Sequence, residues 1–382
     1  MRPTAVRDLA QGPRDDRPDG AGLQAGRIRE RGVSETVTFL SNLWYMAGIS
    51  ARLKPGGLKR VMLCGEPVLL ARTKEGNAFA LRDICPHRAA PLSAGRIKDG
   101  TVECPYHGWR FKPDGVCAHI PSLLADQDVA PERIRVASYP LKEQDGLIWL
   151  YRAADPKDPS PALSPPRVPI GAADGSARPR MVESQLFPCE IDDAVVGLMD
   201  PAHGPFVHRA WWWRSEASIH AKEKRHAPSE RGFTMTTHRP SANSSLYRAL
   251  GGEVTTEIRF ELPGLRFEHI RAGKREVVGF TAVTPLDSAR TLVTQVFYWS
   301  SPVLSLFRPL FRPFMRSFLG QDRAIVEMQN QGLRFSPPQM LIQDADQPAI
   351  WYHRLKKAWA ESVAGGTQFV NPVQERVLRW RS

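Results

Sequence analysis

The segment that decides the fold reads Cys85-Pro86-His87-Arg88, then sixteen further residues after His87 up to Cys104-Pro105-Tyr106-His107-Gly108-Trp109. Each end of the segment carries one cysteine and one histidine beside a proline, which favours a tight loop. Two such loops can hold two metal ions side by side, with thiolates on one ion and imidazoles on the other. The candidate ligands are Cys85, His87, Cys104 and His107.

This ligand set is that of a Rieske [2Fe–2S] centre, in which two histidines replace two cysteines on one iron and the cluster stores one electron. A structural zinc site with two cysteines and two histidines is the alternative. Zinc sites usually pair cysteine with cysteine and histidine with histidine, whereas here each loop supplies one of each, so the pattern favours the cluster. Cys117 and His119 lack a second pair and are assigned to the strand after the second loop.

The length and composition indicate the class of protein. A chain of 382 residues, 42% hydrophobic and 24% charged, is long enough for two domains and is neither a coiled-coil rod nor a disordered tail. No run approaches the roughly 18 apolar residues of a membrane span, and the N-terminus is charged where a signal peptide is apolar. Five cysteines are too few for a disulfide framework. We therefore expect a cytoplasmic protein whose thiols are free to bind metal.

The chain is basic, with a formal net charge of +12. A field of this sign suits nucleic acid, a membrane surface or an acidic protein partner, and the charge alone does not choose among them. Nucleic-acid binding has no further support, because the sequence contains no helix-turn-helix spacing, basic repeat or stacking platform. We therefore expect no nucleic-acid partner.

The chain divides into four segments. Residues 1–35 combine Arg, Asp, Gly and Pro with few aromatic or β-branched residues, which predicts a disordered leader. Residues 36–152 contain short strand-like runs separated by turn signals, which predicts a small all-β Rieske domain. Residues 153–180 are rich in Pro, Asp, Ser and Gly and are the linker candidate, and residues 181–382 form the catalytic domain.

The second domain mixes strand-like and helical patterns. The predicted strands are 253–260, 277–283 and 291–299, and the predicted helices are 190–207, 308–333 and 348–360. Pro309 and Pro313 should interrupt the second of these helices early. A tail containing Arg376, Arg379 and Arg381 follows. The expected fold class is α+β, with a small all-β domain followed by an antiparallel sheet packed by helices.

A second group of metal-ligand candidates lies in the stretch Asp200-Pro201-Ala202-His203-Gly204-Pro205-Phe206-Val207-His208. A helix running through Met199 should stop near Pro201, and a bend then lets the imidazoles of His203 and His208 converge. Two histidines and one carboxylate on one face of Fe(II) leave positions open for O₂ and substrate. The spacing alone is a weak signal, but an upstream one-electron cluster needs an acceptor, which favours an iron site.

The combination resembles the oxygenase α-subunit of Rieske non-haem iron oxygenases, in the branch built from α-subunits alone. Trp44-Tyr45, the two cluster loops and the downstream histidines carry the resemblance, which covers about residues 38–360. It implies that Asp322, in the stretch 320–329, is the third iron ligand. It also implies that Asp200 bridges a cluster histidine to an iron histidine. Gly197 departs from the family, which often has Asn at this position.

The resemblance implies an oxygenase that receives electrons through the cluster and activates O₂ at a mononuclear Fe(II). The expected substrate is small and apolar, aromatic or polycyclic, and the expected reaction is hydroxylation or oxidative demethylation, as in aromatic hydrocarbon catabolism. Electrons come ultimately from NAD(P)H through a ferredoxin, a ferredoxin reductase or both, because the chain has no dinucleotide-binding G-x-G-x-x-G unit and no plant-type ferredoxin motif. The positive charge suits an acidic ferredoxin. The alternative is a Rieske electron carrier or redox sensor with a C-terminal binding module.

Two further expectations concern assembly and substrate. The resemblance implies a head-to-tail homotrimer in which the cluster of one subunit serves the iron of its neighbour. Trp211-Trp212-Trp213 and the aromatic residues of the predicted sheet belong either to a substrate pocket or to the core, which the sequence does not separate. The stretch 240–252 is either a loop that gates the pocket or an ordinary surface loop.

Overall fold

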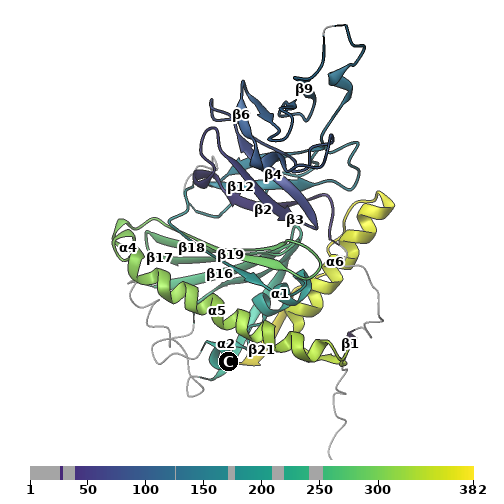
Figure 1. Ribbon diagram of the computed structural model, residues 1–382. Helices are drawn as coiled ribbons and strands as arrows, with labels where there is room; N and C mark the ends of the chain where they lie inside the picture. Colours follow the sequence, from purple (N-terminus) through teal and green to yellow (C-terminus); the bar gives the residue numbers. More distant parts are fainter. Residues whose placement is uncertain (1–25, 29–38, 125, 171–176, 209–218, 241–252) are drawn as a thin grey trace, which may run out of the picture.

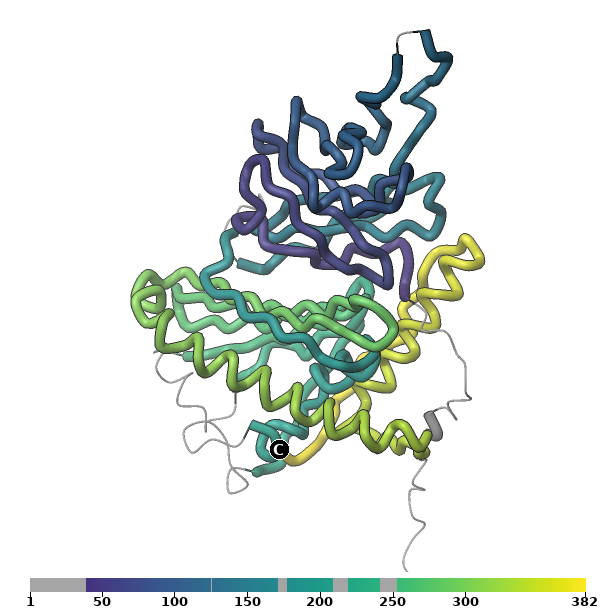
Figure 2. Tube along the Cα trace, in the orientation of Figure 1, coloured from purple at the N-terminus to yellow at the C-terminus, as the bar shows by residue number. Residues whose placement is uncertain are grey.

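The molecule consists of two parts stacked one above the other (Figure 1). The computed structural model describes residues 26–28, 39–124, 126–170, 177–208, 219–240 and 253–382. The upper part is built from residues 39–152, and the lower part contains a large sheet whose lower side is covered by helices (Figures 1 and 2). The expected α+β class, a small all-β domain followed by a sheet packed by helices, is confirmed.

The upper part, which carries the cluster loops, contains three small antiparallel sheets with strand orders β10-β5-β4-β3, β11-β12-β2 and β6-β7-β8-β9. A two-residue turn, Cys64-Gly65, joins β3 to β4 with positive φ at both residues, the geometry that matches the twist of paired strands. The elements are β2 (Leu43–Ile49), η1 (Ser50–Arg52), β3 (Leu58–Leu63), β4 (Glu66–Arg72), β5 (Ala78–Arg82), η2 (Leu92–Ala94), β6 (Arg96–Lys98), β7 (Thr101–Glu103), β8 (Arg110–Phe111), β9 (Cys117–His119), η3 (Pro131–Arg133), β10 (Ser138–Tyr139), β11 (Leu141–Gln144) and β12 (Leu147–Arg152).

The lower part is organised around an eight-stranded antiparallel sheet with the order β13-β19-β18-β17-β16-β15-β14-β21. Its strands are β13 (Met181–Phe187), β14 (Ala221–Ser229), β15 (Gly232–His238), β16 (Val254–Glu261), β17 (Leu265–Ala272), β18 (Arg275–Pro285), β19 (Thr291–Trp299) and β21 (Arg376–Arg381). Its helices are α1 (Ile191–Met199), α2 (Gly204–Val207), α4 (Pro302–Leu306), α5 (Arg308–Leu333) and α6 (Gln347–Gly365). A separate pair of short strands, β1 (Gly26–Ile28) and β20 (Gln339–Leu341), completes the described elements.

Successive residues of a strand point to opposite sides of the sheet. In the large sheet both sides are covered by apolar cores. On the upper face, Phe280 packs against Trp149 of the upper part, with ring centroids 5.9 Å apart. On the lower face, Phe260 meets Tyr352 of α6 edge to face at 5.9 Å. Two apolar cores therefore fix the sheet between the upper part and the helices.

Helix α1, which leads to the histidine motif, is held against α6 by a largely buried carboxylate. Asp192 accepts hydrogen bonds of 2.7 Å from the Tyr352 hydroxyl and from the Lys356 ammonium. Burial alone raises the pKa of a carboxyl group, but the charge and hydrogen bond of Lys356 outweigh burial, so the pKa of Asp192 is lowered. The carboxylate stays charged and fixes the position of α1.

Several predicted elements are found with small changes. The strand predicted at 291–299 and the helix predicted at 308–333 have the expected bounds. The strand predicted at 253–260 is shifted by one residue, to 254–261, and the strand predicted at 277–283 extends by two residues at each end, to 275–285. The early interruption of the second helix is wrong, because α5 runs through Pro313. Pro309 lies in the first turn, where no intrahelical N–H bond is made, and Pro313 removes only one bond from an exposed stretch.

One other expectation needs correction, and two segments near the ends of the chain contain strands. The helix predicted at 190–207 is two helices, α1 and α2, because the chain leaves helical geometry at Asp200 before Pro201. The basic tail contains a strand, β21, which pairs with β14 and extends the large sheet. Within the leader, Gly26–Ile28 pairs with β20 and is therefore ordered into a strand. The remaining leader, Trp211-Trp212-Trp213 and most of the stretch 240–252 lie outside the described residues.

Part of the linker candidate is packed into the fold. Val168 and Ile170, inside the linker candidate, are buried in the core that joins the upper part to the sheet. No helix among the described residues is both long enough and apolar enough to cross a bilayer.

Candidate metal centres

The two cluster loops have the same hydrogen-bonding pattern. The Cys85 N–H donates to the Ala90 carbonyl (2.8 Å) and the Cys85 carbonyl accepts from the Ala89 N–H (2.9 Å). At the second loop, the Cys104 N–H donates to the Trp109 carbonyl (2.8 Å) and the Cys104 carbonyl accepts from the Gly108 N–H (3.1 Å). The residue four positions after each cysteine has positive φ, +57° at Ala89 and +71° at Gly108. Each loop therefore closes on itself by local bonds.

The loops bury their cysteines and present their histidines toward the surface. Cys85 and Cys104 are both buried, and the ring centroids of His87 and His107 lie 4.6 Å apart in an edge-on arrangement. Trp109 stacks on His87 with an interplanar angle of 7°. The thiols therefore lie inside the fold and the imidazoles lie toward the surface, so a cluster held by these four residues would be nearest to solvent on its histidine side.

The electrostatics of the loops suit metal binding. Burial, together with the neighbouring Cys104 thiol, raises the pKa of Cys85 to about 11, while the backbone N–H groups of His87 and Arg88 act in the opposite direction. These N–H groups would stabilise a metal-bound thiolate. Desolvation lowers the pKa of His87, with His107 and Arg88 adding to the effect, which favours the neutral imidazole that binds metal. Two facing thiols and two facing imidazoles are a donor set that fits a [2Fe–2S] cluster.

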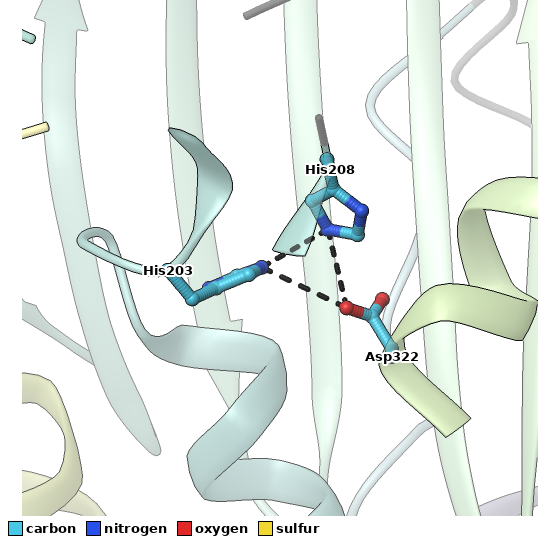
Figure 3. Close-up of side chains that lie close together, drawn as sticks. All are labelled: His203, His208 and Asp322. Carbon is cyan, nitrogen blue, oxygen red and sulfur yellow. Dashed lines mark hydrogen bonds and ion pairs between the residues drawn. The ribbon is translucent and has the colours of Figure 1, made fainter. Parts of the chain in front are cut away.

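A separate group of donors meets on the lower side of the molecule, where Figure 3 shows His203, His208 and Asp322 pointing at one another. The His208 Nε2 atom lies 3.1 Å from the His203 Nε2 atom and 3.1 Å from the Asp322 Oδ1 atom. The His203 Nε2 atom lies 3.8 Å from the same oxygen. Within the described ranges, this is the only group of three or more such side chains whose donor atoms lie within 4.8 Å of one another. The four cluster candidates are spread more widely, which suits two irons better than one zinc ion.

Both histidines are oriented by bonds to their other ring nitrogen. The His203 Nδ1 atom lies 2.8 Å from the Asp200 carbonyl oxygen, and the His208 Nδ1 atom lies 3.0 Å from the Gln321 Oε1 atom. Each oxygen is an acceptor, so each Nδ1 carries the proton and each Nε2 keeps a free lone pair. The arrangement prepares both imidazoles to bind one metal ion through Nε2.

Helix α5 supplies one wall of this site. Phe318, Gln321 and Asp322 lie at the i, i+3 and i+4 positions of one helical face. The Phe318 ring stacks on His208 with ring centroids 3.6 Å apart, and His208 is buried. Glu327 lies one and a half turns further along and pairs with Arg323 at 2.8 Å, away from the histidines. Sequence reasoning missed Gln321, although its place beside Asp322 on the same helix was the available signal.

The bend between α1 and α2 depends on Asp200. Its Oδ1 atom accepts a 2.6 Å hydrogen bond from the Ala202 N–H, and its Oδ2 atom lies 3.7 Å from the His203 Nδ1 atom. Desolvation lowers the pKa of His203, although the nearby carboxylates of Asp200 and Asp322 act in the opposite direction. The neutral form, which is the metal-binding form, is favoured. Gly197, where the family often has Asn, is exposed and has open space around it.

The two donor groups lie at opposite ends of the molecule. The sheet that contains β6 and β9, next to the second cluster loop, is at the top of Figure 1, and α2 is at the bottom. The structure brings together His203, His208 and Asp322, with Asp200 beside them, and separately brings together the four cluster candidates. It does not bring Asp200 near the cluster loops of the same chain.

Two protein families match successive parts of the sequence. Residues 43–140 match the Rieske [2Fe-2S] domain, and residues 197–362 match the vanillate O-demethylase oxygenase C-terminal domain. The chain belongs to the Rieske non-haem iron oxygenases. The resemblance stated from the sequence is thereby confirmed. The [2Fe–2S] cluster and the mononuclear iron of these oxygenases are the cofactors that the two donor sets fit.

Relatives of this Rieske oxygenase act on different compounds. The chain is 41% identical over 140 residues to the 4beta-methylsterol monooxygenase of Methylococcus capsulatus, covering 37% of each protein. It is 37% identical over 175 residues to the oxygenase component of dicamba O-demethylase of Stenotrophomonas maltophilia, covering 46% of this chain and 49% of that protein. These matches span less than half the length of the curated relatives.

The fold of this Rieske oxygenase is also that of a solved relative. The crystal structure of dicamba monooxygenase bound to dicamba superposes with a TM-score of 0.65 at 23% identity, covering 86% of this chain and 100% of that chain. At this level of identity the match establishes the shared fold. The substrate is a separate question.

Proposed function

We propose that this protein is a terminal oxygenase component that receives electrons through a Rieske cluster and uses O₂ to hydroxylate or oxidatively demethylate an apolar substrate. The observation that carries the proposal is the convergence of His203, His208 and Asp322, with both Nδ1 atoms already engaged, in a chain that also carries a Rieske domain. An electron carrier or redox sensor has no use for such an open three-donor site.

The proposal assigns a role to each residue of the two sites. Cys85, His87, Cys104 and His107 hold the cluster. His203, His208 and Asp322 hold Fe(II), which when bound supplies the site where O₂ is activated. Asp200 orients His203, and in an assembly it would also accept a hydrogen bond from His107 of a neighbouring chain. The segments 36–152, 153–180 and 181–382 are the proposed cluster domain, linker and catalytic domain.

The proposed substrate is small and apolar, with an aromatic ring or fused rings. Support comes from the relatives, whose names include a methylsterol monooxygenase and a dicamba O-demethylase. Because the two relatives carry out reactions on a methyl-bearing sterol and on an O-methyl group, we favour monooxygenation or demethylation over dihydroxylation.

The proposed partners are a ferredoxin, a ferredoxin reductase and two further copies of the chain. Cluster loops and iron donors at opposite ends of one chain support a head-to-tail trimer, since electrons would otherwise have to cross the whole molecule (Figure 1). The net charge of +12 supports an acidic ferredoxin. We propose the cytoplasm as the compartment, because the cluster thiols need reducing conditions.

The test is metal analysis followed by turnover under ¹⁸O₂. We expect about three irons and two acid-labile sulfides per chain. With a reductase, a ferredoxin and NAD(P)H, a panel of aromatic and terpenoid substrates should yield a product that contains ¹⁸O, and His208→Ala should abolish this product while the visible absorption of the cluster remains.

Two results would contradict the proposal. Stoichiometric zinc without sulfide would favour a structural metal site. Substrate oxidation that survives both His203→Ala and His208→Ala would favour the carrier with a binding module.

A further inference from the structure

Large apolar side chains are exposed on α4 and at the start of α5. The exposed fractions are 61% for Val303, 78% for Leu306, 42% for Phe307 and 62% for Leu310. Val303 and Leu306 belong to α4, Phe307 lies at the break between the two helices, and Leu310 lies in the first turn of α5. We call this surface of four residues the α4–α5 stripe. It lies at the corner of the lower part where α4 is labelled in Figure 1.

This segment carries apolar side chains on its outer side as well as on its inner side, where Leu304 and Phe311 are half-buried. Surface helices normally turn their apolar face to the core. Two exposed arginines link the segment to the sheet and its flank: Arg308 donates a 3.3 Å hydrogen bond to the Arg180 carbonyl, and the Arg312 Nε atom lies 3.5 Å from Glu183 of β13. The apolar side chains of the stripe point outward, which is the arrangement expected when an apolar phase lies outside the protein.

The segment is anchored to the sheet. The Trp299 indole N–H donates a 2.9 Å hydrogen bond to the Ser305 hydroxyl of α4. Immediately before α4, the Ser300 N–H donates to the Glu276 carbonyl (3.1 Å), and the Ser300 hydroxyl accepts from the Glu276 N–H (2.9 Å). These bonds join the segment to the ends of β18 and β19, so the stripe belongs to the fold.

The charged residues of this segment are all basic. The sequence from Ser301 to Gln321 contains three arginines and no acidic residue. Arg180 and Lys274 are exposed, the first beside Arg308 and the second in the turn that leads into β18. An apolar face edged by cations matches the interface of a bilayer with anionic headgroups, where long basic side chains reach the phosphates while apolar side chains enter the acyl boundary.

We propose that the α4–α5 stripe binds the surface of an anionic membrane. A second copy of the chain is a poorer occupant, because a two-fold contact through the stripe brings arginine rows of like charge together. An acidic ferredoxin is also poorer, because it must approach the cluster loops of the upper part, whereas α4 belongs to the lower part (Figure 1). The same helix α5 carries Asp322, so a membrane on the stripe would be a nearby source of apolar substrate. That consequence rests on the proposed function, whereas the binding does not.

The experiment is co-sedimentation of the cofactor-loaded protein with lipid vesicles. We expect binding to phosphatidylcholine vesicles that contain phosphatidylglycerol, weaker binding to phosphatidylcholine alone, and weakening by salt. The double variant Leu306→Glu/Leu310→Glu removes two apolar contacts and adds two negative charges, and it should lower the partition coefficient about tenfold or more. The control is Val370→Glu, which changes a side chain of matched exposure, 77%, far along the chain after α6, and should bind as wild type does.

Three results would overturn the proposal. The first is wild type that stays in the supernatant with anionic vesicles, and the second is a double variant that binds as tightly as wild type. The third is a change of the double variant's mass in sedimentation velocity without lipid, which would assign the stripe to a contact between copies of the chain. Vesicle binding is measured without turnover. A protein that does not bind vesicles but oxidises substrate would contradict only the membrane proposal, and a protein that binds vesicles but oxidises no substrate would contradict only the proposed function.

Discussion

The imidazole of His208 is held by side chains from a distant helix. Its Nδ1 atom meets the Gln321 amide oxygen at 3.0 Å, and its ring stacks on Phe318. These contacts select the tautomer in which Nε2 faces His203 and Asp322. The amide oxygen of Gln321 therefore determines which ring nitrogen of His208 is free to bind the metal.

Removing that oxygen should weaken the mononuclear iron site without affecting the cluster. We expect Gln321→Leu to lower iron affinity at this site about 10-fold to 100-fold, the usual cost of losing a partner of a metal-bound histidine. Titration of the chelator-treated protein with Fe(II) would measure it. Gln321→Glu, which keeps an acceptor oxygen, should recover most of the affinity, and the exposed Gln329→Leu on the same helix is the control. Equal affinity in all variants would remove the role assigned to Gln321.

Two buried cysteines of the upper part allow a proposed cluster ligand to be compared with a control cysteine. Cys104 and Cys117 are both buried, but only Cys104 lies in a loop closed by the local bonds described above. We expect Cys104→Ser to abolish the visible absorption and the acid-labile sulfide, and Cys117→Ser to leave both unchanged. Loss of the cluster in both variants would mean that the donor set is not the one proposed.

At the scale of the elements, β14 buries a histidine against α6. The ring of His226 lies 5.7 Å from that of Trp351, and burial is the main cause that lowers the pKa of His226 to about 4. In the folded protein the ring is neutral at pH 5, whereas in the unfolded chain, with a pKa of about 6.5, it is protonated. Between these two pKa values the unfolded state therefore binds more protons than the folded state. The free energy of unfolding consequently rises with pH over this range.

This difference predicts how the free energy of unfolding depends on pH. Between pH 7 and pH 4 we expect His226 to account for a loss of about 3 kcal/mol. Denaturant unfolding at several pH values should show a shallower slope for His226→Gln than for wild type. The exposed His119→Gln should retain the wild-type slope. Parallel curves for wild type and His226→Gln would show that the folded protein accommodates the charged ring.

At the scale of the whole molecule, the two donor groups are separated along the long dimension of one chain (Figure 2). A head-to-tail ring closes when each subunit places its cluster beside the iron site of the next. In such a ring Asp200, at the bend between α1 and α2, is the residue placed to meet the neighbour's cluster histidine. Its carboxylate then joins two imidazoles that belong to different chains.

A mixing experiment tests this arrangement. Asp200→Asn keeps the shape and removes the charge, so we expect this variant to retain both metals and yet fail to oxidise its cluster in the presence of substrate and O₂. Cys104→Ser chains lack the cluster but keep Asp200. Mixed trimers should recover activity, because some interfaces pair an intact cluster with an intact Asp200. A monomer in solution, or inactive mixed trimers, would exclude transfer between subunits.

The sequence alone determined the features that depend on neighbouring residues. The two cluster loops were predicted with all four donors, because each loop is closed by bonds between residues at most five positions apart. The bend at Asp200 and Pro201 was predicted for the same reason, and the end of α1 at Met199 agrees with it. Strand 291–299 and helix 308–333 were predicted from their apolar periodicity.

The tertiary structure decided what depends on contacts between distant segments. Asp322 was assigned only through a family resemblance, because nothing near it in the sequence shows that α5 packs beside His208. The Gln321 contact and the stacking of Phe318 arise from the same packing. The tail was described from the sequence only by its arginines, whereas the open edge of β14 supplies the backbone partners that make residues 376–381 a strand. Local bonds are encoded within a few residues, whereas a sheet edge or a shared metal site exists only after the chain has folded back on itself.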